Sequence, residues 1–181
     1  SPTDTPFISS AAKTKATAVL HEWQTDALAA AATNNAVIEG DEATLDAVSA
    51  TTRLSNSSQI MDKTVVITGT QESVDKAGRA SELAYQIAKK AKELKRDMEA
   101  TVTGNQAEVA GNSSTARKFG SLGAWIETND DLGASGSSGG AGNTARTDGT
   151  QRAFTEASLK SVIKSVWNAG GDPSMIMVGP F

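Results

Sequence analysis

The strongest periodic signal in the chain is a stripe of apolar side chains within residues 70–103. At 100° per residue the stripe is about 100° wide, which predicts one amphipathic helix. Gly78 marks a kink or boundary near its start, and Gly104-Asn105 gives a stop. From Ala80 to Thr103 this helix would be about 36 Å long, which is longer than a small hydrophobic core can cover. We therefore expect it to extend beyond the core, and we call it the strut. The stripe comprises Leu83, Ile87, Ala91, Leu94, Met98 and Val102, of which Leu83, Ile87, Leu94 and Met98 are expected to seat the helix on the body.

Alternating side chains predict two strands, at residues 16–24 and 59–68. A polar segment of about 34 residues separates them, which is unusually long for a loop inside a compact domain. We therefore predict a long two-stranded ribbon with an irregular tip. An isolated ribbon is marginally stable in water, so this one needs a neighbour. The side chains expected to shape the ribbon and its contacts are Val19, Trp23, Ile60 and Val66.

The remaining segments predict an N-terminal arm and a mixed body. Residues 1–15 carry turn signals and one apolar anchor at Phe7-Ile8. Residues 114–128 predict a short helix, and residues 131–149 are rich in Gly and Ser, which is typical of a flexible loop. Three further elements are expected near the end of the chain: a helix over 155–168 capped by Thr155, a buried strand over Met175–Val178, and a turn at Gly179-Pro180.

The composition predicts a chain that packs against something besides itself. Hydrophobic residues make up 38% and aromatic residues 4%, which is lean for one dense globule. The net charge of −4 gives no reason to expect a nucleic-acid-binding protein. The absence of cysteine excludes disulfides and thiolate metal sites. No apolar run reaches the roughly 20 residues that span a bilayer.

The only histidine lies in the stretch "HEWQTD" at residues 21–26. His21 with Glu22 or Asp26 is one candidate for a catalytic or metal site. Adjacent side chains on a strand point to opposite faces, so His21 and Glu22 cannot converge on one ligand. A zinc site also needs further ligands that the chain lacks. We favour a packed or interface histidine, and the enzyme reading remains a minor alternative.

A second motif, "GAGNTA" at residues 140–145, matches a Gly-x-Gly-x-x-Ala dinucleotide pattern. That pattern needs a strand before it and a helix after it. Here a Gly/Ser run precedes it and "RTDGT" follows. We interpret the match as compositional and expect no cofactor, no metal ion and no catalytic residue.

Opposite charges gather on two different predicted elements. Residues 16–52 hold six acidic side chains and no Lys or Arg, whereas the strut carries the run "KKAKELKR" at residues 89–96. The basic run is compatible with a solvated face whose charges pair within the helix, such as Glu93 with Arg96 or Lys89. The alternative hypothesis is pairing of the acidic ribbon with the basic strut of another copy. The hypothetical interface comprises His21, Trp23, Asp26, Glu39, Asp41, Glu42, Lys89, Lys92 and Arg96.

The order of arm, ribbon, strut and α/β body resembles the major capsid proteins of tailed bacteriophages, which have the Hong Kong 97-type fold. The residues are similar to a podophage-like group of these proteins, and the likeness covers most of the chain. The matching stretches are "SPTDTPF" (1–7), "HEWQTD" (21–26), "GTQESVDKAGRASELAYQIAKKAKELKRDME" (69–99), "WIETN" (125–129), "DGTQRAFTEASLK" (148–160) and "DPSMIMVGP" (172–180).

The resemblance implies an α+β fold and a role for each segment. Residues 1–15 would be the N-terminal arm and residues 16–68 the extended β-hairpin loop that lies on a neighbouring subunit. Residues 69–130 would hold the spine helix and the start of the peripheral domain. After the flexible loop at 131–149, residues 150–181 would lead into the central, axial part of the fold. The rest of that fold is missing, so the chain is expected to be truncated or partial.

The implied function is structural rather than enzymatic. Copies would form pentamers and hexamers of an icosahedral head that encloses double-stranded DNA, with contact to decoration or portal proteins and none to a membrane. The implied location is the virion, after assembly in the cytoplasm of a bacterial host. Three alternatives remain: an encapsulin-like nanocompartment shell, a phage tail or baseplate adaptor, and a hydrolase that uses His21.

Overall fold

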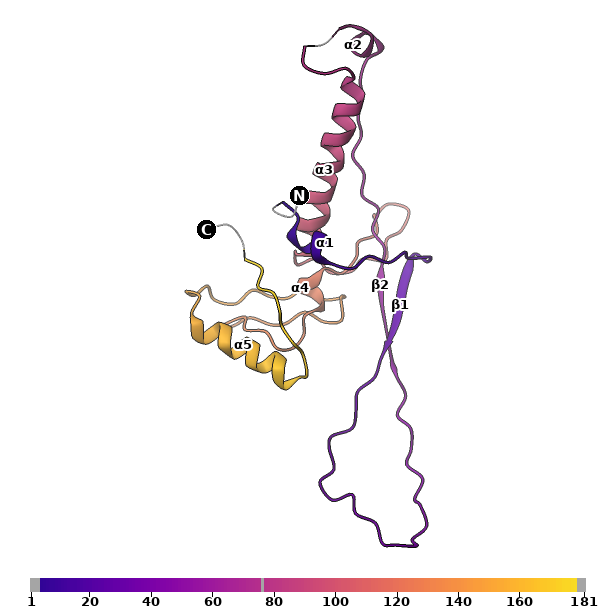
Figure 1. Ribbon diagram of the computed structural model, residues 1–181, viewed down its shortest axis with the longest axis vertical. Coiled ribbons are helices and arrows are strands. Elements are labelled where there is room, and N and C mark those ends of the chain that lie inside the picture. Colours follow the sequence, from indigo (N-terminus) through magenta and orange to yellow (C-terminus); the bar gives the residue numbers. More distant parts are fainter. Residues whose placement is uncertain (1–3, 76, 179–181) are drawn as a thin grey trace.

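The computed structural model describes residues 4–75 and 77–178, and it combines helices with a two-stranded sheet (Figure 1). The molecule is elongated. The longest helix extends from one side of a small central body, and the two-stranded ribbon with its loop extends from the other. In chain order the elements are α1 (Pro6–Ser10), β1 (Leu20–Thr25), β2 (Thr52–Ser57), α2 (Gly69–Ser73), α3 (Glu82–Val102), α4 (Leu122–Trp125) and α5 (Glu156–Asn168).

The predicted strut is confirmed as α3. Its N-cap is Ser81, whose hydroxyl accepts a hydrogen bond from the N–H of Ala84 at 3.1 Å. The short α2 precedes it, and Gly78, with φ of +84°, lies between the two helices. A φ in this region favours glycine, so Gly78 suits the break between α2 and α3.

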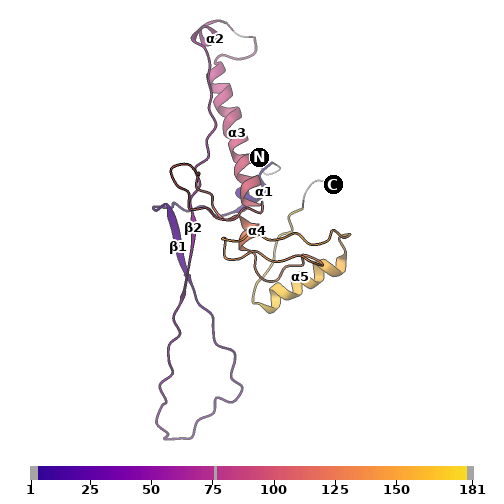
Figure 2. The same cartoon turned by 180° about the vertical axis from the view of Figure 1, so that it is seen from behind.

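The second predicted strand is wrong, because residues 59–68 form no strand and run alongside α3 (Figure 2). Met61 lines a cavity with Leu94 and Met98, and Val65 lines another with Leu94. The alternation in this segment therefore reflects contact with a helix rather than pairing with β1. Ile60 and Val66, which were predicted to shape the ribbon, lie in this segment instead and are 81% and 91% exposed.

An ion pair adds to the contact between this segment and α3. Lys63 Nζ lies 2.5 Å from Asp97 Oδ2, and the hydrogen bond to that carboxylate raises the pKa of Lys63. Toward the N-terminal end of α3 the cover is incomplete. Leu83 and Ile87, which were expected to seat the helix, are 44% and 54% exposed.

The strands that do form are β1 and β2, which pair antiparallel from Leu20↔Ser57 to Thr25↔Thr52. β1 overlaps the predicted strand at 16–24, whereas β2 lies in the segment predicted to be polar tip. Its sequence, "TRLSNS", holds one large apolar side chain, so hydrophobic alternation could not reveal it.

The N-terminal arm is held on α3 by Glu99. The backbone N–H groups of Phe7 and Ile8 donate to the two carboxylate oxygens of Glu99 at 2.7 and 2.8 Å. Both residues are half-buried, which confirms the predicted anchor. Residues 11–19, which connect α1 to β1, are exposed.

The helix predicted over 114–128 is reduced to the single turn of α4. Close backbone packing explains the difference. A Cβ at Gly120 would lie 2.6 Å from the carbonyl oxygen of Gly142, and one at Gly123 would lie 2.8 Å from that of Gly104. Because Gly120 and Gly123 have no side chain, the backbone of distant loops can approach them closely. Glycine also has a low helix propensity, so a longer helix does not form here.

The Gly/Ser-rich segment at 131–149 packs on α4 instead of extending as a linker. The N–H of Gly142 donates to the carbonyl of Ala124 at 3.0 Å, and the N–H of Gly139 donates to that of Ile126 at 3.2 Å. Isolated bridges join Ser137 to Thr147 and Gly140 to Thr144 within the segment. Its glycines therefore serve close packing in this structure.

The predicted helix over 155–168 is confirmed as α5, and the Thr155 hydroxyl accepts from the N–H of Ser158. The strand predicted over Met175–Val178 is wrong, because these residues form no strand and are 44–67% exposed. A strand needs a neighbour for its backbone groups, and none is present here among the described residues. The turn predicted at Gly179-Pro180 lies outside the described residues.

The described part of the chain buries little of its apolar surface. Ala124 is its only buried hydrophobic residue, and many large apolar side chains are exposed. No helix in residues 4–75 or 77–178 has the length and apolar character to cross a membrane.

Candidate assembly surface

The ribbon loop, which we define as residues 26–51, is exposed throughout. One tight turn gives it local structure, where the N–H of Asp41 donates to the carbonyl of Ile38 at 3.1 Å. Five large apolar side chains of this loop are exposed to solvent: Leu28, Val37, Ile38, Leu45 and Val48, with exposed fractions of 78–101%. So much uncovered apolar surface on one segment is typical of a surface that another molecule covers.

The charge of the ribbon loop is uniformly negative. It carries Asp26, Glu39, Asp41, Glu42 and Asp46, and it contains no Lys or Arg. On β1, Glu22 pairs with Arg53 across the ribbon at 2.6 Å, and this hydrogen bond raises the pKa of Arg53. The carboxylates of the loop have no such basic partner among the described residues. A partner surface that covers the loop should therefore carry positive charge.

The two faces of β1 differ as the alternation predicts. The ring of Trp23 lies 5.0 Å from that of Trp125 on the body, and the His21 ring lies 5.8 Å from the Trp23 ring. Glu22 instead pairs with Arg53 on the neighbouring strand. The face with His21 and Trp23 thus turns toward its own body, which leaves Glu22 and Gln24 on the outer face.

His21 lies beside an aromatic ring on the ribbon. Its side chain makes no hydrogen bond within the described residues, and its neighbour is an aromatic ring. Within the same residues there is no cluster of three or more His, Cys, Asp or Glu side chains that could hold a metal ion. The contact that the structure gives the His21 side chain is the one with the Trp23 ring.

Asn56 fixes the base of the ribbon to the body. Its amide nitrogen donates to the carbonyl of Gly120 at 3.0 Å, and its amide oxygen accepts from the N–H of Gly120 at 2.7 Å. Next to it, the hydroxyl of Ser57 donates to Glu108 at 2.5 Å. Together with the contact between Trp23 and Trp125, these bonds determine the direction in which the ribbon leaves the body.

Replacing Asn56 with Ala is expected to lower the free energy of unfolding by about 1–3 kcal/mol, because Gly120 loses both partners at a partly buried site. Chemical denaturation of the purified chain measures this loss. Asn35→Ala in the exposed ribbon loop is the matched control and should change stability by less than about 0.5 kcal/mol. Equal effects of the two substitutions would contradict a clamp at Asn56.

The basic face, which we define as Lys89, Lys92 and Arg96, lies on the side of α3 away from the apolar stripe. All three side chains are exposed and form no ion pair with any described residue. The pair within the helix joins Lys90 to Glu93 at 2.7 Å and lowers the pKa of Glu93. Pairing within the helix is therefore made by Lys90 rather than by Lys89 or Arg96, and Lys89 adds a smaller electrostatic effect that also lowers the pKa of Glu93.

The structure separates the two charged surfaces within one chain. The ribbon loop lies at one end of the molecule and α3 at the other, so the two surfaces do not meet (Figure 1). His21 and Trp23 lie with the body, apart from both surfaces. Sequence reasoning missed Asn56, for which no motif gives a signal. It also missed Arg117, which lines a separate cavity.

Comparisons with known proteins point to one family. A family model described as "SU10 major capsid protein" matches residues 1–181. The chain is also 42% identical over 107 residues to the major capsid protein of Escherichia phage Phieco32. That match covers 59% of this chain and 30% of the relative, so the chain spans less than a third of the relative's length.

Proposed function

Because the chain belongs to the SU10 major capsid protein family, we propose that it is a structural subunit whose copies assemble into the icosahedral head of a bacteriophage. The observation that carries the proposal is the ribbon loop, whose apolar and acidic side chains are exposed and are not covered by any described residue of their own chain. A neighbouring copy would supply that cover. Family membership and the relative's name point to a non-enzymatic protein.

The proposed arrangement is a Hong Kong 97-type fold. The order of α1, the ribbon, α3 and the body agrees with the order that this fold requires. Residues 1–15 would be the N-terminal arm, 16–68 the extended loop, and 69–130 the spine helix with the start of the peripheral domain. Residues 131–149 would connect these to 150–181, which would lead into the axial part of the fold.

The mechanism we propose is geometric. Each ribbon would lie on the next subunit and complete its surface, and repetition of this heterologous contact would close pentamers and hexamers into a shell. The shell would enclose double-stranded DNA through contacts that do not depend on base sequence. Decoration or portal proteins would add to it in the virion, after assembly in the cytoplasm of a bacterial host.

Negative-stain microscopy of the expressed full-length protein tests the proposal. Closed shells that contain DNA would support it. Shells with a protein cargo would indicate a nanocompartment, and rings or tubes would indicate a tail or baseplate adaptor. If His21→Ala abolished a hydrolase activity of the purified protein, an enzyme would replace the structural reading.

Reversal of the basic face, by Lys89→Glu, Lys92→Glu and Arg96→Glu together, is expected to weaken assembly in low salt. The acidic ribbon loop of a neighbour would then meet like charge. Light scattering against salt concentration measures the effect, which should shrink as ionic strength rises.

The matched control reverses three other exposed cations, Lys118, Lys160 and Lys164, and leaves α3 intact. It changes the net charge by the same amount, so it separates local pairing from general repulsion. Assembly of the basic-face variant at the level of this control would refute pairing at Lys89, Lys92 and Arg96.

A further inference from the structure

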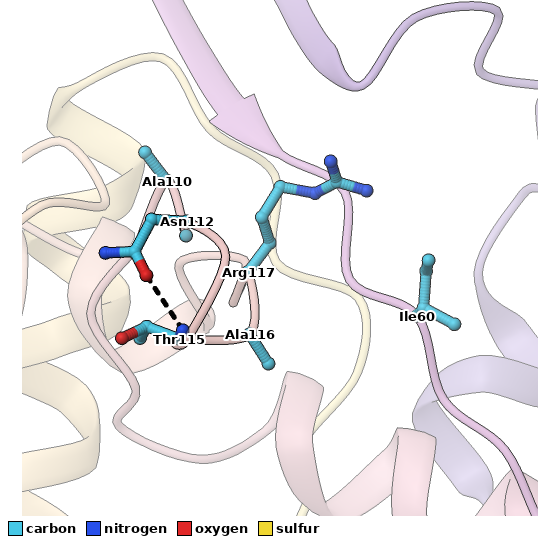
Figure 3. Close-up of a pocket in the computed structure, with 7 residues that line it drawn as sticks. Ile60, Ala110, Asn112, Thr115, Ala116 and Arg117 are labelled. Atoms are coloured by element: carbon cyan, nitrogen blue, oxygen red, sulfur yellow. Dashed lines mark hydrogen bonds between the residues drawn. The ribbon is translucent and has the colours of Figure 1, made fainter.

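A cavity of about 350 Å³ opens between the loop at residues 110–117 and Ile60, which follows β2 (Figure 3). A bridge between Val109 and Lys118 closes the base of the loop. At its turn, the Asn112 side chain accepts from the N–H of Thr115 at 2.9 Å. These contacts join the two ends of the loop and stabilise its turn.

Arg117 lines this cavity, and its side chain extends from the loop toward the segment that carries Ile60 (Figure 3). Its Nε atom is buried and has no hydrogen-bond partner. A buried donor without an acceptor is costly and rare, and it calls for an explanation. The guanidinium also makes no ion pair with any described residue.

The position of Arg117 is set by Gly111. A Cβ at Gly111 would lie 2.5 Å from Cγ of Arg117, so the backbone of Gly111 packs directly on the arginine side chain. Gly111 has a φ of +75°, which also favours glycine. Packing that restrains an arginine before binding lowers the entropy that an ion pair would cost.

The lining of the cavity defines the chemistry of a ligand. Ile60, Ala110 and Ala116 provide apolar surface in the same cavity that Arg117 lines. An apolar group beside a carboxylate matches this combination. Arginine recognises carboxylates well, because its planar fork donates two parallel hydrogen bonds.

We propose that Arg117 binds the carboxylate of Glu39 from a second copy of this chain, and that Ile38 of that copy enters the apolar part of the cavity. The proposal rests on the proposed shell function, in which the ribbon loop lies on a neighbour. It goes further because it assigns the contact of the loop's turn to one cavity on the receiving subunit.

The turn of the ribbon loop carries both chemical groups that this contact needs. Gly40, with φ of +84°, turns the chain between Ile38 and Asp41. The carboxylate of Asp41 accepts from the N–H of Glu42, whereas Glu39 has no partner within the described residues. Ile38 is 78% exposed beside Glu39. The turn thus presents an apolar group and a free carboxylate together.

The same chain does not place its own turn in this cavity. The turn lies in the middle of the ribbon loop, and the loop lies beyond β1 and β2, on the side away from the body (Figure 1). The cavity lies at the other end of β2, next to Ile60. The turn that enters the cavity would therefore come from a second copy.

A charge-swap series tests the assignment with the full chain. Arg117→Glu is expected to raise the concentration needed for particle formation about tenfold or more, as loss of a buried interfacial charge pair does. Lys118→Glu is the matched control, because it makes the same charge change at the adjacent exposed residue. Glu39→Arg should also weaken assembly, and the combination of Glu39→Arg with Arg117→Glu should restore most of it.

Arg117→Met removes the charge and keeps an unbranched side chain of similar length. This variant therefore separates a defect in assembly from a defect in folding. It should keep the thermal unfolding temperature of the parent chain and still assemble poorly. If the parent assembles and Arg117→Glu behaves like Lys118→Glu, or if the double substitution gives no rescue, the assignment of Arg117 is wrong while the shell function stands. A parent chain that forms no particles overturns both.

Discussion

Replacing residues 27–50 with the dipeptide Asn-Gly is expected to abolish particle formation while the body stays folded. The register pairs Thr25 with Thr52, so Asp26 and Thr51 would flank a two-residue hairpin turn. Asn-Gly suits such a turn because both of its residues adopt positive φ readily. The substitution removes the exposed apolar side chains and four of the five carboxylates of the ribbon loop, and with them the surface proposed to lie on the neighbour.

Two measurements make this result decisive. Circular dichroism should show a cooperative thermal transition close to that of the parent chain, because the loop makes few contacts with the body. Negative-stain microscopy should show no shells. A control that keeps the loop length and replaces its acidic residues with Asn and Gln should give partial assembly, because the apolar side chains remain. Normal shells from the shortened chain would exclude the ribbon loop as the main assembly element.

Trp125→Ala is expected to lower the free energy of unfolding by about 3 kcal/mol, at the lower end of the range for a buried tryptophan. Trp125 is half-buried, contacts the ring of Trp23 and packs closely on the backbone of Gly142. Its loss leaves a void where α4, the ribbon and residues 131–149 meet. Denaturant unfolding of the purified chain measures the change.

Two further variants separate the contributions at this site. The indole N–H of Trp125 is buried without a hydrogen-bond partner, so Trp125→Phe removes an unpaired donor and should cost less than the alanine substitution. A double-mutant cycle with Trp23→Ala should give a coupling of about 1 kcal/mol for the two rings. A coupling near zero would show that Trp23 does not fix the ribbon through Trp125.

The two long helices, α3 and α5, were predictable because each carries its own signals. α3 has a stripe with helical spacing and a serine cap, and α5 has a threonine cap. These signals are local, so one sequence suffices to read them. The alternation of His21 with Glu22 was readable for the same reason.

Elements that depend on distant contacts were not predictable. β2 has a polar sequence and becomes a strand through pairing with β1. Residues 59–68 alternate like a strand, yet they lie along α3. In both cases tertiary contact overrides the local pattern.

The candidate surface was predictable in its charges and not in its geometry. The acidic side chains of residues 26–51 and the basic run on the strut can be counted in the sequence. The roles of Asn56, Gly111 and Arg117 cannot be read from the sequence. Each of these residues acts through contact with a segment that is distant in sequence or that depends on the conformation of its loop. Composition alone suggested that residues 131–149 were a linker, although Gly142 lies against Trp125.

The contact of α1 with Glu99 has a consequence for the order in which the protein folds. The bonded residues are 91 and 92 positions apart in sequence. The residues of α1 are therefore synthesised well before Glu99, to which they bind. A five-residue helix is not stable alone in water. The segment Pro6–Ser10 therefore gains a fixed structure only after the end of α3 has been synthesised. Attachment of α1 is thus a late folding event, and protection of α1 from proteases would report that α3 is complete.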